Sequence, residues 1–200
     1  AHESDDDGLI HPQELTLALD EAAHDDAFFT ADGGSPMVWM LRHIRANGKR
    51  RTLSSLVHGT MANAYPQAIG IQKAFPERQV IAMCGDGGMT MLMGDLLTLK
   101  QEKIPLKIVV FNNSSLGFVE LEQKVDGLLD SYTDLDNPDF GLLAQSIGLW
   151  GRRVEQEHEL KHAIAEWLAH PGPAILDVKV NRMELVMPPK IEPGQVTSTA

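Results

Sequence analysis

The sequence predicts an α/β fold, a three-layer α/β/α sandwich built around a six-stranded parallel sheet. Six short apolar segments with the character of strands alternate along the chain with segments of helical periodicity. Two of the strands, residues 80–84 and 108–111, are apolar throughout, which is typical of parallel strands covered by helices on both faces. Polar or glycine-rich turns follow several strands, at the edge where open α/β sheets bind ligands.

The elements follow in order from the charged segment 1–8, which we interpret as a linker. Prolines in the first turns, at positions 12, 36 and 66, and apolar stripes such as Leu160, Ile164 and Leu168 mark the helices. Strands are predicted at residues 27–31, 51–56, 80–84, 108–111, 149–154 and 174–180. Helices are predicted at residues 11–22, 36–44, 64–74, between 88 and 105, around 118–122, and at 140–147 and 157–170. Residues 9–182 then form one domain, and 183–200 a tail without periodicity.

Composition limits the partners and the compartment. The chain of 200 residues has a net charge of −11, which argues against nucleic acid or an anionic membrane surface as its main partner. Its single cysteine, Cys84, allows no disulfide within the chain, in keeping with a reducing cytoplasm. No apolar run reaches the length of a membrane span, and the first residues do not resemble a signal peptide.

Two neighbouring strands are each followed by residues that suit a metal and a phosphate. Gly85-Asp86-Gly87-Gly88 follows one strand, and Asn112-Asn113 ends the next. Carboxylate and amide oxygens are ligands for Mg²⁺, and glycine amides at a helix start suit phosphate. A plain strand–turn–helix whose glycines only permit tight packing is the alternative. The pattern is neither a P-loop nor a GxGxxG fingerprint.

The spacing of these two motifs resembles that of the thiamine diphosphate enzymes. MCGDGG, MLMGD, KIVVFNNS and LGFVELE together resemble the branch of quinone-dependent pyruvate dehydrogenases (pyruvate oxidases), and the resemblance extends from about Leu9 to Pro189. It implies a sheet with strand order 2-1-3-4-6-5. It also implies that the chain is the C-terminal, diphosphate-binding domain of a larger enzyme that converts pyruvate oxidatively to acetate and CO₂.

The same resemblance implies partners beyond this segment. Electrons would pass to FAD, which another domain binds, and then to a quinone. A further domain would supply a glutamate to the cofactor's pyrimidine ring across the interface of a homo-oligomer, expected to be a tetramer. The full enzyme is expected in the cytoplasm, associated peripherally with the inner face of the membrane through a segment that is absent here.

Carried over residue by residue, the resemblance also names a site. Asp86 and Asn113 would ligate Mg²⁺ by their side chains and Ser115 by its carbonyl, whereas Asn112 would face the other way, because alternate strand residues point to opposite sides. The other expected cofactor contacts are Gly34, Ser35, Gly59, Met61, Gly87, Gly88, Leu116 and Gly117. Met61 would hold the cofactor in its bent form, unless it only fills a gap in the core. A helix cap is the alternative for Ser35.

Phe118 and Glu122 lie one helical turn apart and would line the substrate pocket. Acetolactate synthases carry a Trp at the position that matches Glu122, so this residue favours the oxidase branch, and a solvated surface position is its alternative. Gly33 departs from the family pattern, in which a Val is usual. The polar segment 125–138 is expected to be a mobile loop over the site.

Two other functions remain open at this point. One is an acetolactate-synthase-like carboligase, in which a second keto acid joins the product of the first. The other is a nucleotide-binding module that kept the fold and lost catalysis, against which the presence of Met61, Asp86 and Asn113 argues.

Overall fold

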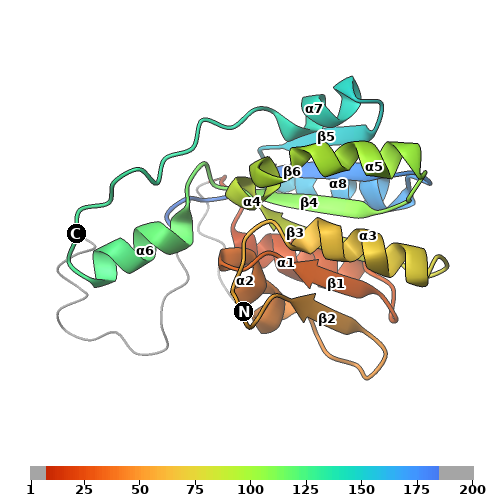
Figure 1. The fold of residues 1–200 in the computed structure, drawn as a ribbon, viewed down its shortest axis with the longest axis horizontal. Helices are drawn as coiled ribbons and strands as arrows, with labels where there is room; N and C mark the ends of the chain where they lie inside the picture. Colours follow the sequence, from red (N-terminus) through yellow and green to blue (C-terminus); the bar gives the residue numbers. More distant parts are fainter. Residues whose placement is uncertain (1–7, 185–200) are drawn as a thin grey trace.

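The computed structural model describes residues 8–184 and has the predicted three-layer architecture (Figure 1). All strand pairings in the sheet are parallel. The order β2-β1-β3-β4-β6-β5 confirms the order that the family resemblance implies. The strands are β1 Phe28–Ala31, β2 Arg51–Ser54, β3 Val80–Gly85, β4 Lys107–Asn112, β5 Trp150–Val154 and β6 Ala174–Lys179.

Helices cover both faces of the sheet. Their bounds are α1 Pro12–Ala22, α2 Ser35–His43, α3 Ala64–Ala74, α4 Asp86–Met91, α5 Leu96–Gln101, α6 Gly117–Val125, α7 Phe140–Ser146 and α8 Glu157–Ala169, with a short 3₁₀ helix, η1, at Met93–Asp95. Side chains of successive residues in the central strands point to opposite faces of the sheet. In β3, Ile81 and Met83 pack with α1, α2 and α8, whereas Ala82 and Cys84 pack with α3, α5 and α7.

The segment between Gly88 and Pro105 corrects one prediction, because it is not a single helix. The first helix, α4, begins at Asp86, within the glycine motif, and ends before Leu92, whose φ of −126° is not helical. After η1 the chain restarts as α5, and this change of direction buries Leu96 and Leu99 in the core. A run rich in Met and Leu gives no periodic signal for such a break.

The segment that joins α6 to α7 is irregular, as predicted, but backbone hydrogen bonds attach it to the end of β4. The amide of Leu116 donates to the carbonyl of Thr133 (2.8 Å), and the amide of Leu135 donates to the carbonyl of Ser114 (3.0 Å). Figure 1 shows α6 at one end of the molecule, and from there the chain returns to α7 as an extended segment without regular secondary structure. The expected mobility of this loop stays a prediction.

The predicted linker and tail lie almost entirely outside the described residues. Within residues 8–184, no helix is both long enough and apolar enough to cross a membrane.

Candidate functional site

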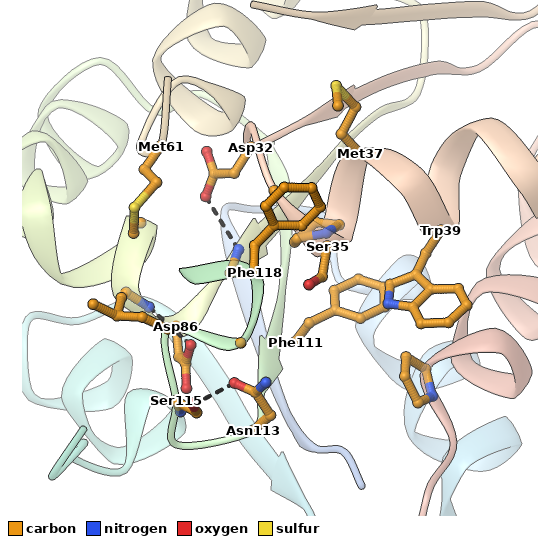
Figure 2. A pocket seen from close by; sticks show the side chains of 18 of the residues that line it. Asp32, Ser35, Met37, Trp39, Met61, Asp86, Phe111, Asn113, Ser115 and Phe118 are labelled. Atoms are coloured by element: carbon orange, nitrogen blue, oxygen red, sulfur yellow. Dashed lines mark hydrogen bonds between the residues drawn. The ribbon is translucent and has the colours of Figure 1, made fainter. Parts of the chain in front are cut away.

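The carboxyl ends of β1, β3 and β4 open into a cavity of about 410 Å³ (Figure 2). Every residue that the sequence analysis assigned to cofactor, metal or substrate lines this cavity. These residues are Gly34, Ser35, Gly59, Met61, Asp86, Gly87, Gly88, Asn113, Ser115, Leu116, Gly117, Phe118 and Glu122. The structure therefore brings together four separate stretches of chain at one place, while the binding role of each residue stays a prediction.

Asp86 stands at the start of α4 and is 3 % exposed. Its Oδ1 accepts the amide N–H of Gly87 (2.9 Å), and its Oδ2 accepts the amide of Ser114 (2.7 Å) and the side chain of Asn137 (2.8 Å). Burial raises the pKa of this carboxyl above its usual range, and these donors, with the nearby charge of Lys179, act against the rise. The Gly87 amide thus already has an acceptor in Asp86, and its expected contact with the diphosphate stays a prediction.

Asn113 and Ser115 follow β4 in a tight turn. The amide of Ser115 donates to the side-chain oxygen of Asn113 (3.1 Å), and Ser114 between them has a φ of +56°. Asn112, one residue earlier, is fully buried and donates to Asp177 (2.9 Å), so it points away from the cavity as expected. Asp86, Asn113 and Ser115 thus lie together in Figure 2.

Glycines let two backbone segments approach closely on the β1 side. A Cβ on Gly33 would stand 2.2 Å from the carbonyl oxygen of Gly59, so the Val usual in the family does not fit here. Gly34, with φ +125°, is the N-cap of α2. Because Gly34 takes that position, the helix-cap alternative for Ser35 is wrong, and its side chain lies at the cavity wall (Figure 2).

Met61 and Leu116 meet over the glycine turn. A Cβ on Gly87 would come within 2.9 Å of the Met61 methyl carbon and 2.7 Å of Leu116 Cδ2. Among the described residues, Met61 belongs to neither core cluster, and it lines the cavity instead. The alternative that Met61 only fills a gap in the core is therefore removed. Its proposed action on a cofactor is not tested by this arrangement.

Phe118, Val119 and Glu122 form the α6 side of the cavity. All three are exposed to solvent in this chain, so this wall is open. The surface alternative for Glu122 therefore stands beside its role as a pocket residue.

Several cavity residues were not identified from the sequence. Asp32, at the end of β1, is 2 % exposed, and it accepts the amides of Ala64 (2.8 Å) and Gly85 (3.1 Å). Burial raises its pKa to about 6. Trp39 and Phe111 add an aromatic wall on the α2 side (Figure 2). Of these residues only Asp32 gave a sequence signal, as an acid that directly follows a buried strand.

The donor set fits a magnesium–diphosphate site. Within residues 8–184 there is no group of three or more His, Cys, Asp or Glu that could hold a metal. A cation at Asp86 would have one carboxylate, the Asn113 amide oxygen and the Ser115 carbonyl, and Mg²⁺ commonly completes such a set with phosphate oxygens. The aromatic wall beside these oxygens suits a ligand with both a diphosphate and flat rings.

Comparisons with known proteins agree with this fit. The family of thiamine pyrophosphate enzymes, by its C-terminal TPP-binding domain, matches residues 32–178. The chain is 40 % identical over 186 residues to YdaP of Bacillus subtilis, provisionally named as a thiamine pyrophosphate-containing protein, and covers 32 % of it.

Two acetolactate synthase large subunits are also similar. The one from Parasynechococcus marenigrum is 37 % identical over 194 residues, and isozyme 2 from Escherichia coli is 31 % identical over 191 residues. These matches use 94 % of this chain but only 31 % and 35 % of the two subunits, so the chain spans about a third of the length of its relatives.

Proposed function

Because the chain belongs to the thiamine pyrophosphate enzymes, as their C-terminal TPP-binding domain, we propose that it binds thiamine diphosphate and Mg²⁺ for the decarboxylation of a 2-oxo acid. The observation that carries this proposal is the meeting of Asp86, Asn113 and Ser115 at one cavity. Thiamine diphosphate, when bound, supplies the electron sink that lets a 2-oxo acid lose CO₂.

The residues of this chain would divide the work of binding and orientation. Asp86 and Asn113, with the Ser115 carbonyl, would hold the cation between protein and diphosphate. Met61 would support the rings from the β3 side and exclude water there. Phe118 and Glu122, on the open α6 wall, would face the substrate, and Gly33 would let the Gly59 backbone lie against the turn after β1, where a larger side chain would collide with it.

The fate of the substrate separates two candidate enzymes. The names of the relatives favour an acetolactate-synthase-like carboligase, the alternative of the sequence analysis, over a pyruvate:quinone oxidoreductase. One observation supports the oxidoreductase. Glu122 lines the cavity, and a carboxylate there would repel the carboxylate of an incoming second keto acid. In that case the electrons would pass to FAD and a quinone.

The products decide between these candidates. The full-length enzyme should be supplied with pyruvate, thiamine diphosphate, Mg²⁺, FAD and a quinone analogue, and acetate, acetolactate and reduced quinone should be measured. Acetolactate without quinone reduction establishes the carboligase, whereas acetate with reduced quinone establishes the oxidoreductase. If the folded, cofactor-loaded enzyme makes neither acetate nor acetolactate, that result contradicts the proposal and favours a silent module.

A pair of variants tests the position of Glu122. Glu122→Trp should move the product balance toward acetolactate if the residue faces substrate, and Glu122→Gln should move it less, because it removes only the charge. Glu157→Gln, at the start of α8 and away from the cavity, is the control. A wild-type product balance in both Glu122 variants would make the residue part of the surface.

Other domains and copies of the enzyme are proposed to cover the open wall. Val125, Leu128 and Leu129, at and beyond the end of α6, are 40 %, 60 % and 90 % exposed, and apolar surface of this kind supports an interface. Light scattering of the full-length enzyme tests the proposed tetramer. A monomer at micromolar concentration would contradict it.

A further inference from the structure

The Asp86 carboxylate has an uneven set of hydrogen bonds. Its two oxygens offer about four acceptor sites in all. Oδ2 accepts two donors, the amide of Ser114 and the side chain of Asn137, at 2.7 and 2.8 Å. Oδ1 accepts one donor among the described residues, the amide of Gly87. Oδ2 is therefore saturated, and Oδ1 keeps one acceptor site.

Asn137 makes a second hydrogen bond, to the last residue of β4. Its amide also donates to Asn112 Oδ1 (3.2 Å), and Asn112 in turn receives Lys179 Nζ (3.1 Å). The residues after it are anchored as well. Arg153 donates to the carbonyl of Pro138 (2.9 Å).

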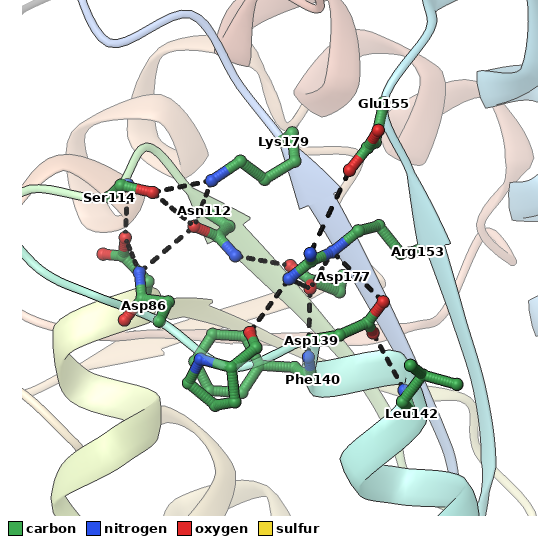
Figure 3. Close-up of polar contacts among 12 residues, drawn as sticks. Asp86, Asn112, Ser114, Asp139, Phe140, Leu142, Arg153, Glu155, Asp177 and Lys179 are labelled. Carbon is green, nitrogen blue, oxygen red and sulfur yellow. Dashed lines mark hydrogen bonds and ion pairs between the residues drawn. The ribbon is translucent and has the colours of Figure 1, made fainter.

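Asp177 completes this anchor. It is fully buried, accepts the amide of Phe140 at the start of α7 (3.1 Å), and pairs with Arg153 (2.7 Å). Figure 3 shows this chain of contacts running from Asp86 through Asn112 to Asp177 and Arg153. Asn137 thus approaches Asp86 from a segment that several hydrogen bonds tie to β4, β5 and β6.

We propose that Asn137 determines the metal selectivity of the site by keeping Asp86 Oδ2 occupied, so that only Oδ1 is open to a cation. Mg²⁺ requires a compact octahedral set and accepts a carboxylate through one oxygen. Ca²⁺ takes more oxygens and can use both oxygens of one carboxylate. A carboxylate that presents a single oxygen therefore disfavours Ca²⁺ relative to Mg²⁺. This inference rests on the proposed function, because it assumes that a cation binds at Asp86.

The test measures cation affinity and not turnover. Mg²⁺ and Ca²⁺ should be titrated separately by calorimetry into the full-length enzyme with saturating thiamine diphosphate. In Asn137→Ala we expect the Mg²⁺ affinity to fall by about tenfold, as for other groups that orient a metal ligand. The Ca²⁺ affinity should fall less or rise, so the ratio of Ca²⁺ to Mg²⁺ affinity should increase on the order of tenfold.

Two further variants keep the result interpretable. Asn137→Leu has a similar size and removes the donor without adding a charge, so it should raise the same ratio even if the alanine variant folds poorly. Asp136→Asn, at the exposed neighbouring position, is the control and should leave the ratio at its wild-type value. An unchanged ratio in both Asn137 variants would overturn the inference. Wild-type enzyme that binds no Mg²⁺ with thiamine diphosphate would overturn the proposed function itself.

Discussion

Two buried aspartates at the carboxyl edge of the sheet, Asp32 after β1 and Asp86 after β3, differ in what holds them. Burial raises the pKa of both carboxyls. Asp32 accepts the backbone amides of Ala64, at the start of α3, and of Gly85, at the end of β3, so it connects these two elements. A Cβ on Gly88 would stand 2.2 Å from its Oδ2, which leaves no space for a ligand on that side. Asp86 has one acceptor site left on Oδ1 among the described residues, and it lines the cavity together with Asn113 and Ser115.

Burial and a raised pKa are shared by both carboxyls and therefore do not identify a metal ligand. An acid whose oxygens are surrounded by backbone is a structural connector, and an acid with one open oxygen beside other oxygens can ligate.

Removing the Asp86 charge should have the largest effect on binding. In the full-length enzyme, Asp86→Asn should weaken Mg²⁺-dependent thiamine diphosphate binding on the order of a thousandfold, beyond the 10–100-fold typical of groups that only orient a ligand. Asp32→Asn should weaken it by less than about tenfold, since it alters only a connector. Calorimetry measures both. Equal losses in the two variants would erase the distinction.

Asp32 should instead control the pH dependence of stability. Its carboxyl binds a proton in the folded chain up to about pH 6, whereas the unfolded chain releases it near 3.8. Its contribution to stability is therefore present below about pH 4 and is lost as the pH rises through 6. The difference in free energy of unfolding, wild type minus Asp32→Asn, should fall by about 3 kcal/mol between these limits.

Urea unfolding of the chain at several pH values measures this difference. Asp25→Asn, at an exposed position, is the control and should give a difference that varies little with pH. Parallel curves for wild type and Asp32→Asn would show that the buried carboxyl titrates as it does in the unfolded chain.

Met61 should affect rate more than affinity. If its side chain supports the reactive geometry, Met61→Ala should lower kcat by about tenfold or more and change cofactor affinity by less than about threefold. Met91→Ala, on the exposed side of α4, should change neither. A Met61 variant with wild-type kcat would leave the residue as part of the cavity wall without a role in turnover.

The fold could be predicted almost completely, because buried parallel strands and amphipathic helices leave strong periodic signals. The strand order came from the family resemblance, since six alternating strands alone permit other orders. The site motifs were visible because Gly85–Asp86 and Asn112–Asn113 end strands. The break at Leu92 was not visible, because a run of apolar residues looks the same in one helix or two.

The residues that hold the site were harder to identify. Asn137 reaches Asp86 from 51 residues away in the sequence, and Asp32 reaches Gly85 from 53. No local pattern encodes these contacts, since each depends on two loops that meet only in the folded sheet. The sequence shows that Gly33 departs from the family pattern, but the physical reason, the approach of the Gly59 backbone, is visible only in the structure.

The position of the cation tests the central claim most directly. Crystals of the full-length enzyme with thiamine diphosphate and Mn²⁺, which stands in for Mg²⁺, would locate the ion by its anomalous scattering. We predict one peak within ligand distance of Asp86 Oδ1 and the Asn113 side chain, with Asn137 still hydrogen-bonded to Oδ2. A peak at Asp32, or an ion held by both oxygens of Asp86, would contradict the account.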